Sequence, residues 1–291
     1  MEGMNASPST PPKSIDTLFP LLLKEWKDSW ADATNAAGEL KCKVELAWGE
    51  GYEDESSLIE AMDAANVQTA LATDLLAWSY RRNARFAKDM TGQIAALTER
   101  YPGRIYGLAD YDPTDIRASL AKVEEDVTKR GYKGVYLHIY GYDRPLHHRT
   151  LYPLYAMCEG LGVPVSMQTG HVLEAMPSEH GRPMQLDRIA CDFPDLTMIG
   201  THTGYPWVDE MVAVASKWPN VYLSLSAWLP RHFSPALVRY LRSRAGREKV
   251  MYGSNGLPWH RYNKQFQEME LEEAVLSKIL YDNAARVFGL D

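Results

Sequence analysis

The sequence predicts a single-domain α/β fold, a closed barrel of eight parallel strands that are each followed by a helix, the (β/α)8 or TIM barrel. Short apolar, β-branched runs alternate with amphipathic segments along most of the chain. Eight such units fit within 291 residues, which suits a closed barrel better than an open doubly wound sheet. The composition, 45% hydrophobic and 24% charged, is that of a globular chain with a sizeable core.

The strands and helices can be assigned in chain order. The predicted strands cover 14–18, 67–73, 105–110, 134–138, 164–168, 197–202, 221–226 and 250–254. The predicted helices cover 55–65, 84–100, 115–129, 151–161, 184–192, 207–217, 234–244 and 271–287. Asp115 and Ser234 stand at N-cap positions, and Pro235 takes the first helical position after Ser234. Glycine follows several helices directly, as C-caps require.

Two segments do not fit the alternation. Residues 1–13 are rich in Ser, Pro and Asn and predict a loose N-terminal tail, which leaves 14–291 as the barrel domain. Residues 19–54 are far longer than a usual strand-to-helix loop of about 2–6 residues. This segment carries Trp26, Trp30 and Trp48 among charged residues. We expect it to be a lid-like insertion over the barrel mouth, with a peripheral helical hairpin as the alternative.

The charge and cysteine content narrow the range of partners. A net charge of −7 argues against a nucleic-acid or anionic-membrane partner, because both require a concentrated basic surface. No run approaches the roughly 18 apolar residues of a membrane span. The three cysteines, Cys42, Cys158 and Cys191, have unrelated spacings and suggest no disulfide framework. We therefore expect a cytoplasmic protein with a small-molecule substrate.

Polar side chains gather where the predicted strands end. In a parallel barrel the active site lies at the C-terminal ends of the strands. The residues at or just after these ends include three histidines and two carboxamides: His138, Gln168, His171, His202 and Asn255. Trp207 and Trp259 lie near strand ends and would suit an aromatic or cyclic ligand. Packing beneath the lid is the alternative for the tryptophans, and a structural role is the alternative for each histidine.

Four stretches resemble a known family. They are VPVSMQTGH, DFPDLTMIGTHTGYPWVDEMVAVASKWPNVYLSLSAW, SPALVRYL and KVMYGSNGLPW…ILYDNAARVFGL. They are similar to blocks of the amidohydrolase-related family that includes aminocarboxymuconate-semialdehyde decarboxylase, aromatic-acid decarboxylases and lactone hydrolases. The similarity is close from about residue 100 to the C-terminus and faint before residue 55. The resemblance implies a barrel, a catalytic acid/base at His202, and a homodimer or a complex with a related barrel subunit.

The metal-binding positions of that family differ in this sequence. The family usually opens with I-D-x-H-x-H, whose histidines bind a divalent metal, whereas Leu18 and Pro20 stand at those positions here. Two further ligand positions align with Gln168 and Asn255. Apolar side chains offer a metal nothing, and a carboxamide oxygen is a weak ligand. The sequence therefore predicts no metal and no cofactor, with a rebuilt site of His138, His171 and His202 left as the alternative.

Two functions remain open at this point. The first is a metal-independent enzyme that hydrolyses or decarboxylates a small carboxylated or cyclic, possibly aromatic, substrate. His202 would act as general acid or base near the ordinary histidine pKa of about 6.5, with Gln168 and Asn255 donating hydrogen bonds to the substrate. The second is a non-catalytic barrel that binds a ligand or serves as the partner subunit of an active relative.

Overall fold

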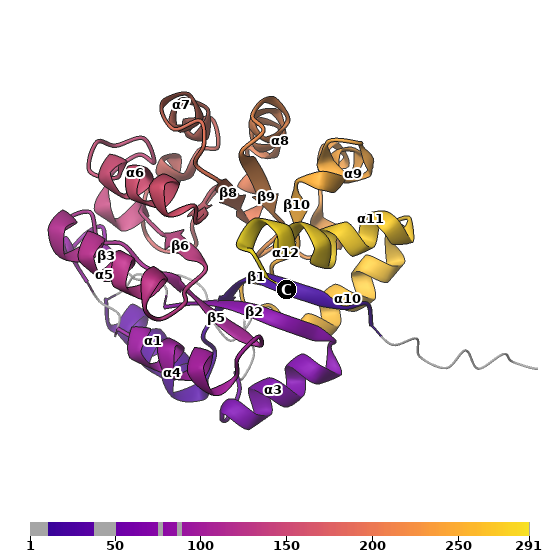
Figure 1. The fold of residues 1–291 in the computed structure, drawn as a ribbon, viewed down its shortest axis with the longest axis horizontal. Coiled ribbons are helices and arrows are strands. Elements are labelled where there is room, and N and C mark those ends of the chain that lie inside the picture. The colour runs from indigo at the N-terminus through magenta and orange to yellow at the C-terminus, as the bar shows by residue number, and fades with distance from the viewer. Residues whose placement is uncertain (1–10, 38–50, 75–77, 86–88, 291) are drawn as a thin grey trace, which may run out of the picture.

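A computed structural model describes residues 11–37, 51–74, 78–85 and 89–290 of the chain. Its main sheet confirms the predicted (β/α)8 barrel, with helices around the outside of the strands (Figure 1). Neighbouring strands in this sheet pair in parallel. Their order is β1 (Ser14–Pro20), β2 (Val67–Thr73), β5 (Ile105–Ala109), β6 (Gly134–Leu137), β7 (Val165–Gln168), β8 (Met198–Thr201), β9 (Val221–Ser224) and β10 (Val250–Met251).

The outer helices follow the predicted alternation. They are α3 (Glu55–Ala64), α4 (Thr91–Arg100), α5 (Ile116–Thr128), α6 (Tyr152–Leu161), α7 (Gln185–Asp192), α8 (Val208–Lys217), α9 (Pro235–Arg242), α11 (Glu273–Ser277) and α12 (Asn283–Phe288). The two N-caps form as expected, because Asp115 accepts from the Ala118 amide and Ser234 from the Leu237 amide. Within the described residues, no helix is both long and apolar enough to cross a membrane.

Three elements differ from the sequence prediction. The helix predicted at 84–100 begins only at Thr91, because Ala84–Arg85 (β4) pairs antiparallel with Trp78–Ser79 (β3). Helix α10 (Trp259–Glu268) was not predicted. The helix predicted at 271–287 consists of α11, a π-helical turn at Lys278–Asp282 and α12.

The segment after β1 is described only in part. Strand β1 continues to Pro20, and α1 (Lys24–Ala37) follows with Trp26 and Trp30 buried. Leu23 then bridges to Tyr52, where the described chain resumes. Residues 38–50, with Trp48 and Cys42, and residues 1–10 of the predicted tail lie outside the described residues. The lid and the tail therefore stay predictions.

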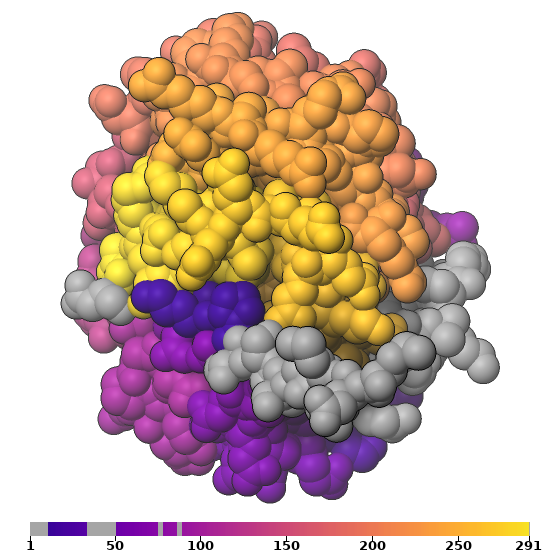
Figure 2. All heavy atoms as spheres, turned by 90° about the vertical axis from the view of Figure 1, so that its right-hand side faces the viewer, coloured from indigo at the N-terminus to yellow at the C-terminus, as the bar shows by residue number. Residues whose placement is uncertain are grey.

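The barrel closes where β1 meets β10, the two ends of the strand order. The Thr17 amide donates to the Tyr252 carbonyl at 3.1 Å, and the Asn255 amide donates to the Leu18 carbonyl at 2.8 Å. Figure 2 shows the C-terminal part of the chain, in yellow, beside the described residues that lead into β1, in indigo. We call this boundary the seam. Individual hydrogen bonds connect its two sides, in place of a continuous strand pairing.

Asp16 is the buried centre of the seam. Its carboxylate accepts from the Ser254 amide at 2.8 Å, from the Ser254 hydroxyl, and from the Trp259 indole N–H at 2.8 Å. The Leu18 amide adds a fourth hydrogen bond at 3.2 Å. Burial raises the pKa of Asp16 to about 6, although these hydrogen bonds oppose the shift. One carboxylate thus holds together elements from both ends of the chain.

Candidate functional site

Strand β6 and strand β7 direct polar side chains into the barrel mouth. Gln168 is the last residue of β7 and is 6% exposed. The Tyr136 hydroxyl donates to Gln168 Oε1 at 2.7 Å, so the amide N–H groups of Gln168 can face a ligand. His138 lies two residues after Tyr136 and therefore on the same side of β6. The structure brings these predicted residues, His138 and Gln168, to adjacent strand ends.

Unusual backbone conformations mark the ends of β8, β9 and β10. Four non-glycine residues there have positive φ: His202 (60°), Thr203 (57°), Ala227 (67°) and Asn255 (50°). Such conformations cost roughly 1–3 kcal/mol each and gather at functional sites. Three neighbouring strand ends therefore carry strained backbone on the side where the barrel rule places the active site.

His202 is held by hydrogen bonds on one side of its ring. Its Nδ1 lies 2.8 Å from Thr201 Oγ1 and 3.3 Å from Ser226 Oγ, and its amide donates to Ser226 Oγ at 3.0 Å. The Thr201 hydroxyl donates to the Met167 carbonyl at 3.3 Å. The Thr201 oxygen can then accept a hydrogen bond from Nδ1–H, and we assign His202 this tautomer. This tautomer leaves a lone pair on Nε2, which is the acceptor atom of His202.

The environment of His202 keeps its ring neutral. The pKa of His202 is lowered to about 3, first by burial and then by the nearby His138 and His171. The expectation of a pKa near 6.5 for His202 was therefore wrong. It failed because a sequence does not show how completely three strand ends enclose the ring. At neutral pH Nε2 of His202 therefore carries a lone pair in the free protein and has no proton to donate.

The loop between β7 and α7 brings His171 close to His202. The His171 amide donates to the Tyr205 carbonyl at 2.7 Å, and its ring lies 5.5 Å from the Tyr205 ring and 5.8 Å from the Trp228 ring. Gly170 precedes it with φ +89°, and a Cβ there would lie 2.3 Å from the Tyr205 carbonyl oxygen. Only glycine fits so close an approach, which fixes the start of this loop.

Glu174 is a site residue that the sequence prediction missed. Its Oε1 lies 3.8 Å from His138 Nε2, and the two side chains are only 13% and 8% exposed. His138 Nδ1 is buried and has no hydrogen-bond partner among the described residues. Glu174 lies six residues past the end of β7, so a search of strand ends alone does not reach it. The available signal was an acidic residue in a loop that directly follows a candidate site strand.

The remaining predicted site residues, Asn255, Trp259 and Trp207, make other contacts. Asn255 follows the seam, and its amide is bonded to Leu18. Trp259 is 3% exposed and donates to Asp16. The guanidinium carbon of Arg182 lies over the Trp207 ring, 5.9 Å from the centre of that ring. Their predicted role in substrate binding stays a prediction.

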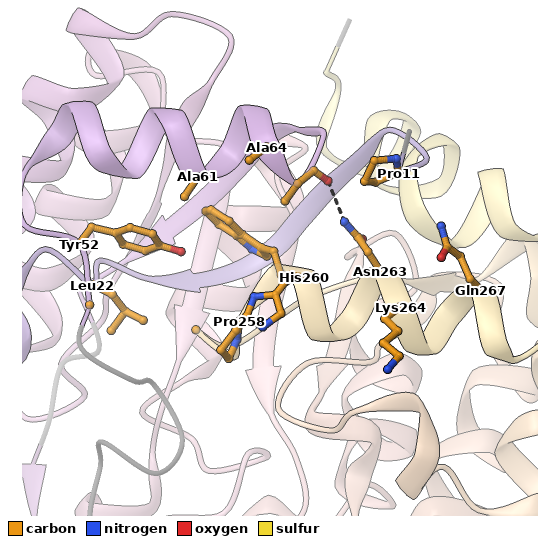
Figure 3. Close-up of a pocket in the computed structure, with 14 residues that line it drawn as sticks. Pro11, Leu22, Tyr52, Ala61, Ala64, Pro258, His260, Asn263, Lys264 and Gln267 are labelled. Atoms are coloured by element: carbon orange, nitrogen blue, oxygen red, sulfur yellow. Dashed lines mark hydrogen bonds between the residues drawn. The ribbon is translucent and has the colours of Figure 1, made fainter. Parts of the chain in front are cut away.

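A separate groove of about 530 Å³ lies between α3 and α10. Figure 3 shows Ala61 and Ala64 of α3 on one side and Asn263, Lys264 and Gln267 of α10 on the other. The Asn263 amide donates to the Ala65 carbonyl at 2.9 Å across one end. None of the mouth residues His138, Gln168, Glu174 and His202 lines this groove.

The residues at the family's metal positions do not fit a divalent ion. Leu18 is fully buried and apolar, and the Gln168 oxygen is already bonded to Tyr136. In the part of the chain that the structure describes, no three His, Cys, Asp or Glu side chains are close enough to hold a metal ion.

Comparisons with known proteins place the fold. The family model described as Amidohydrolase matches residues 48–290. No curated protein matches the chain. A solved, uncharacterised TIM-barrel protein from Bordetella bronchiseptica is 24% identical, with a TM-score of 0.75 over 96% of this chain and 99% of that chain. The 5-carboxyvanillate decarboxylase from Sphingomonas paucimobilis is 16% identical, with a TM-score of 0.69 over 96% of this chain and 99% of that chain.

A third solved structure corrects the cofactor prediction. The dihydroxybenzoic acid decarboxylase from Polaromonas sp. JS666 is 15% identical, with a TM-score of 0.69 over 96% of this chain and 97% of that chain. It was solved with bound manganese and the inhibitor 2-nitroresorcinol. The prediction of no cofactor is therefore wrong for this group of proteins, in which manganese is the implied cofactor. The prediction failed because it depended only on the four altered motif positions.

Proposed function

Because this chain belongs to the amidohydrolase family, we propose that it is an enzyme that decarboxylates a small aromatic or cyclic acid. The solved structures most similar to it include decarboxylases of 2,6-dihydroxybenzoate and 5-carboxyvanillate. The observation that carries the proposal is the pairing of an acceptor, Nε2 of His202, with a donor, the Gln168 amide, on neighbouring strands of one barrel mouth.

The two groups have complementary roles toward a hydroxylated aromatic acid. The Gln168 N–H groups would donate to the substrate carboxylate, while His202 Nε2 would accept a proton from a ring hydroxyl. Removing that proton raises the electron density of the ring, which prepares the ring carbon for protonation. His202 and Gln168 are 8% and 6% exposed, so their hydrogen bonds act in a medium of low polarity and are stronger than in water.

The first prediction is that His202→Asn lowers kcat by about 10²–10⁴-fold, the usual worth of a general base. KM should change little, because the effect belongs to the transition state. Asparagine tolerates the positive φ at this position, so the backbone should keep its conformation. The measurement is turnover of a panel of hydroxybenzoates and vanillate-type acids, with and without added manganese.

His260→Asn is the matched control, since His260 is an exposed residue of α10 outside the mouth. It should retain full activity. If the unaltered protein binds members of the panel, as seen by thermal shift, but transforms none, the enzyme proposal fails. The non-catalytic barrel, as a ligand-binding protein or partner subunit, would then be the better account.

A further inference from the structure

Decarboxylation needs a proton that His202 does not hold. When carbon dioxide leaves an aromatic ring, the electron pair of the broken bond stays on the ring carbon and must take up a proton. In the free protein His202 is neutral and presents a lone pair on Nε2. In the proposed function, the proton that it takes from the ring hydroxyl returns to that oxygen, so it does not supply the ring carbon. If the proposed function holds, another group in the barrel mouth must be the acid.

The two tyrosines nearest His138 are already committed as donors. Tyr136 donates to Gln168 Oε1, and the Tyr140 hydroxyl lies 3.2 Å and 3.0 Å from the carbonyl oxygens of Gln168 and Gly170. Burial raises the pKa of both tyrosines well above the ordinary value. Both phenols therefore hold their protons in structural hydrogen bonds.

The side chains of His138 and Glu174 are close together, nearly buried, and make no other side-chain hydrogen bond within the described part of the chain. No described residue makes a hydrogen bond to His138 Nδ1, and Nε2 faces Glu174 Oε1 at 3.8 Å. A buried carboxylate is costly without a partner, and the ring of His138 is the partner that this geometry offers. The separation of 3.8 Å is too long for a direct hydrogen bond, so a proton on Nε2 would remain available to a ligand.

We propose that His138 is the catalytic proton donor and that Glu174 is the positioning residue that holds its protonated ring. The bond between the ring carbon and the carboxyl carbon breaks, and its electron pair stays on the ring carbon. The proton on His138 Nε2 forms the new C–H bond, and carbon dioxide leaves. His138 becomes neutral and takes a new proton from solvent, while Glu174 remains a carboxylate throughout.

The titratable groups around His138 come from three neighbouring elements and one loop. They are Tyr136 on β6, Tyr140 in the turn after it, Glu174 in the loop after β7, and His202 after β8. Glu174 is the carboxylate among them, so its removal is the sharpest single change. Glu179 lies in the same loop, is 65% exposed and pairs with Arg182, which makes it the matched control.

The experiment measures two reactions in heavy water with the full chain. One is decarboxylation, and the other is exchange of ring hydrogen for deuterium in the decarboxylated product, which reports ring protonation without carbon dioxide loss. His138→Gln should lower both rates by about 10²-fold or more. Glu174→Gln should lower kcat by up to about 10²-fold with KM unchanged, and Glu174→Asp should recover part of the loss. Glu179→Gln should match the unaltered protein.

The outcomes separate the two proposals. If the unaltered protein decarboxylates its substrate and folded His138→Gln retains kcat, the proton donor is another group and this inference is overturned. If decarboxylation is absent but His138-dependent exchange is present, the proposed function fails and the proton donor stands. Absence of both reactions overturns both. Thermal unfolding of each variant identifies any that fail to fold, and Glu174→Asp tests the pair if Glu174→Gln is one of them.

Discussion

Asp74, directly after β2, is a buried carboxylate with poor compensation. It is 2% exposed, and the Arg85 guanidinium lies 3.6 Å away. Burial raises the pKa of Asp74 to about 7, and the nearby carboxylates of Asp110 and Asp89 act in the same direction. The folded protein therefore holds a proton here that the unfolded chain, with an ordinary aspartate pKa near 3.8, releases.

The sign of the resulting pH dependence follows directly. Between about pH 4 and pH 7 the folded state binds more protons at Asp74 than the unfolded state, so this residue lowers the free energy of unfolding as the pH rises. Asp74→Asn should remove that loss and be more stable than the unaltered protein at pH 8 by about 1–3 kcal/mol. Urea unfolding of both proteins at pH 5 and pH 8 measures the difference in their free energies of unfolding. The exposed Asp63→Asn should keep the original pH dependence, and an unchanged dependence in Asp74→Asn would contradict the assignment.

The site residues show what a sequence can reveal at this scale. His138, Gln168 and His202 could be selected because parallel barrels gather the ends of their strands at one mouth. The low pKa of His202 could not be predicted, since it arises from enclosure by β8, β9 and two other histidines. Glu174 was missed because loop conformation, which local sequence does not determine, brings it back to His138.

Among the elements, the loop from β7 to α7 is held at two glycines. A Cβ on Gly170 would meet the Tyr205 carbonyl, and a Cβ on Gly181 would lie 2.0 Å from the Tyr140 hydroxyl. The Gly170 amide also donates to the Gly181 carbonyl at 2.8 Å, which joins the two ends of the loop. His171 and Glu174 lie between these points, so the loop presents both side chains from a fixed base.

Gly170→Ala should destabilise the protein by about 2–4 kcal/mol, because the added methyl group meets backbone and φ is +89°. Gly160→Ala is the control from helix α6, where a Cβ meets no atom within 4 Å. It should be stabilising by about 0.5–1 kcal/mol, because alanine favours a helix over glycine. Thermal and urea unfolding of both variants provide the measurement. Equal stabilities of the two variants would contradict this prediction, because the loop would then have shifted to make room for the added methyl group at position 170.

The elements also differ in how visible they were in the sequence. The strands of the barrel are buried on both faces and appear as apolar runs, so all eight were found. Helix α10 is mostly polar and was missed, although Trp259, Tyr262 and Phe266 have helical spacing and are buried. The hairpin of β3 and β4 has only two residues in each strand, too few to show a period.

The whole molecule depends on the seam at Asp16. Removing its carboxylate would leave the Ser254 amide and the Trp259 indole as buried donors without an acceptor. Asp16→Ala should therefore lower the free energy of unfolding by about 3 kcal/mol or more. It should also speed hydrogen exchange at the Ser254 amide. Asp28→Ala, which removes an exposed carboxylate paired with Lys24, should leave the unfolding midpoint unchanged. An Asp16→Ala variant as stable as Asp28→Ala would show that closure does not need this residue.

The seam also sets an order of events during synthesis. Thr17 and Tyr252 are bonded across 235 residues of chain, and Asp16 and Trp259 across 243. Contacts between residues so far apart in sequence close a long loop of chain, and the entropy cost of that closure slows their formation. A ribosome that has not yet translated β10 has produced a sheet with two open edges, and β1 has no partner on one side. The first strand made is thus the last to be enclosed, so the nascent barrel has to avoid pairing with other chains until its final strand emerges.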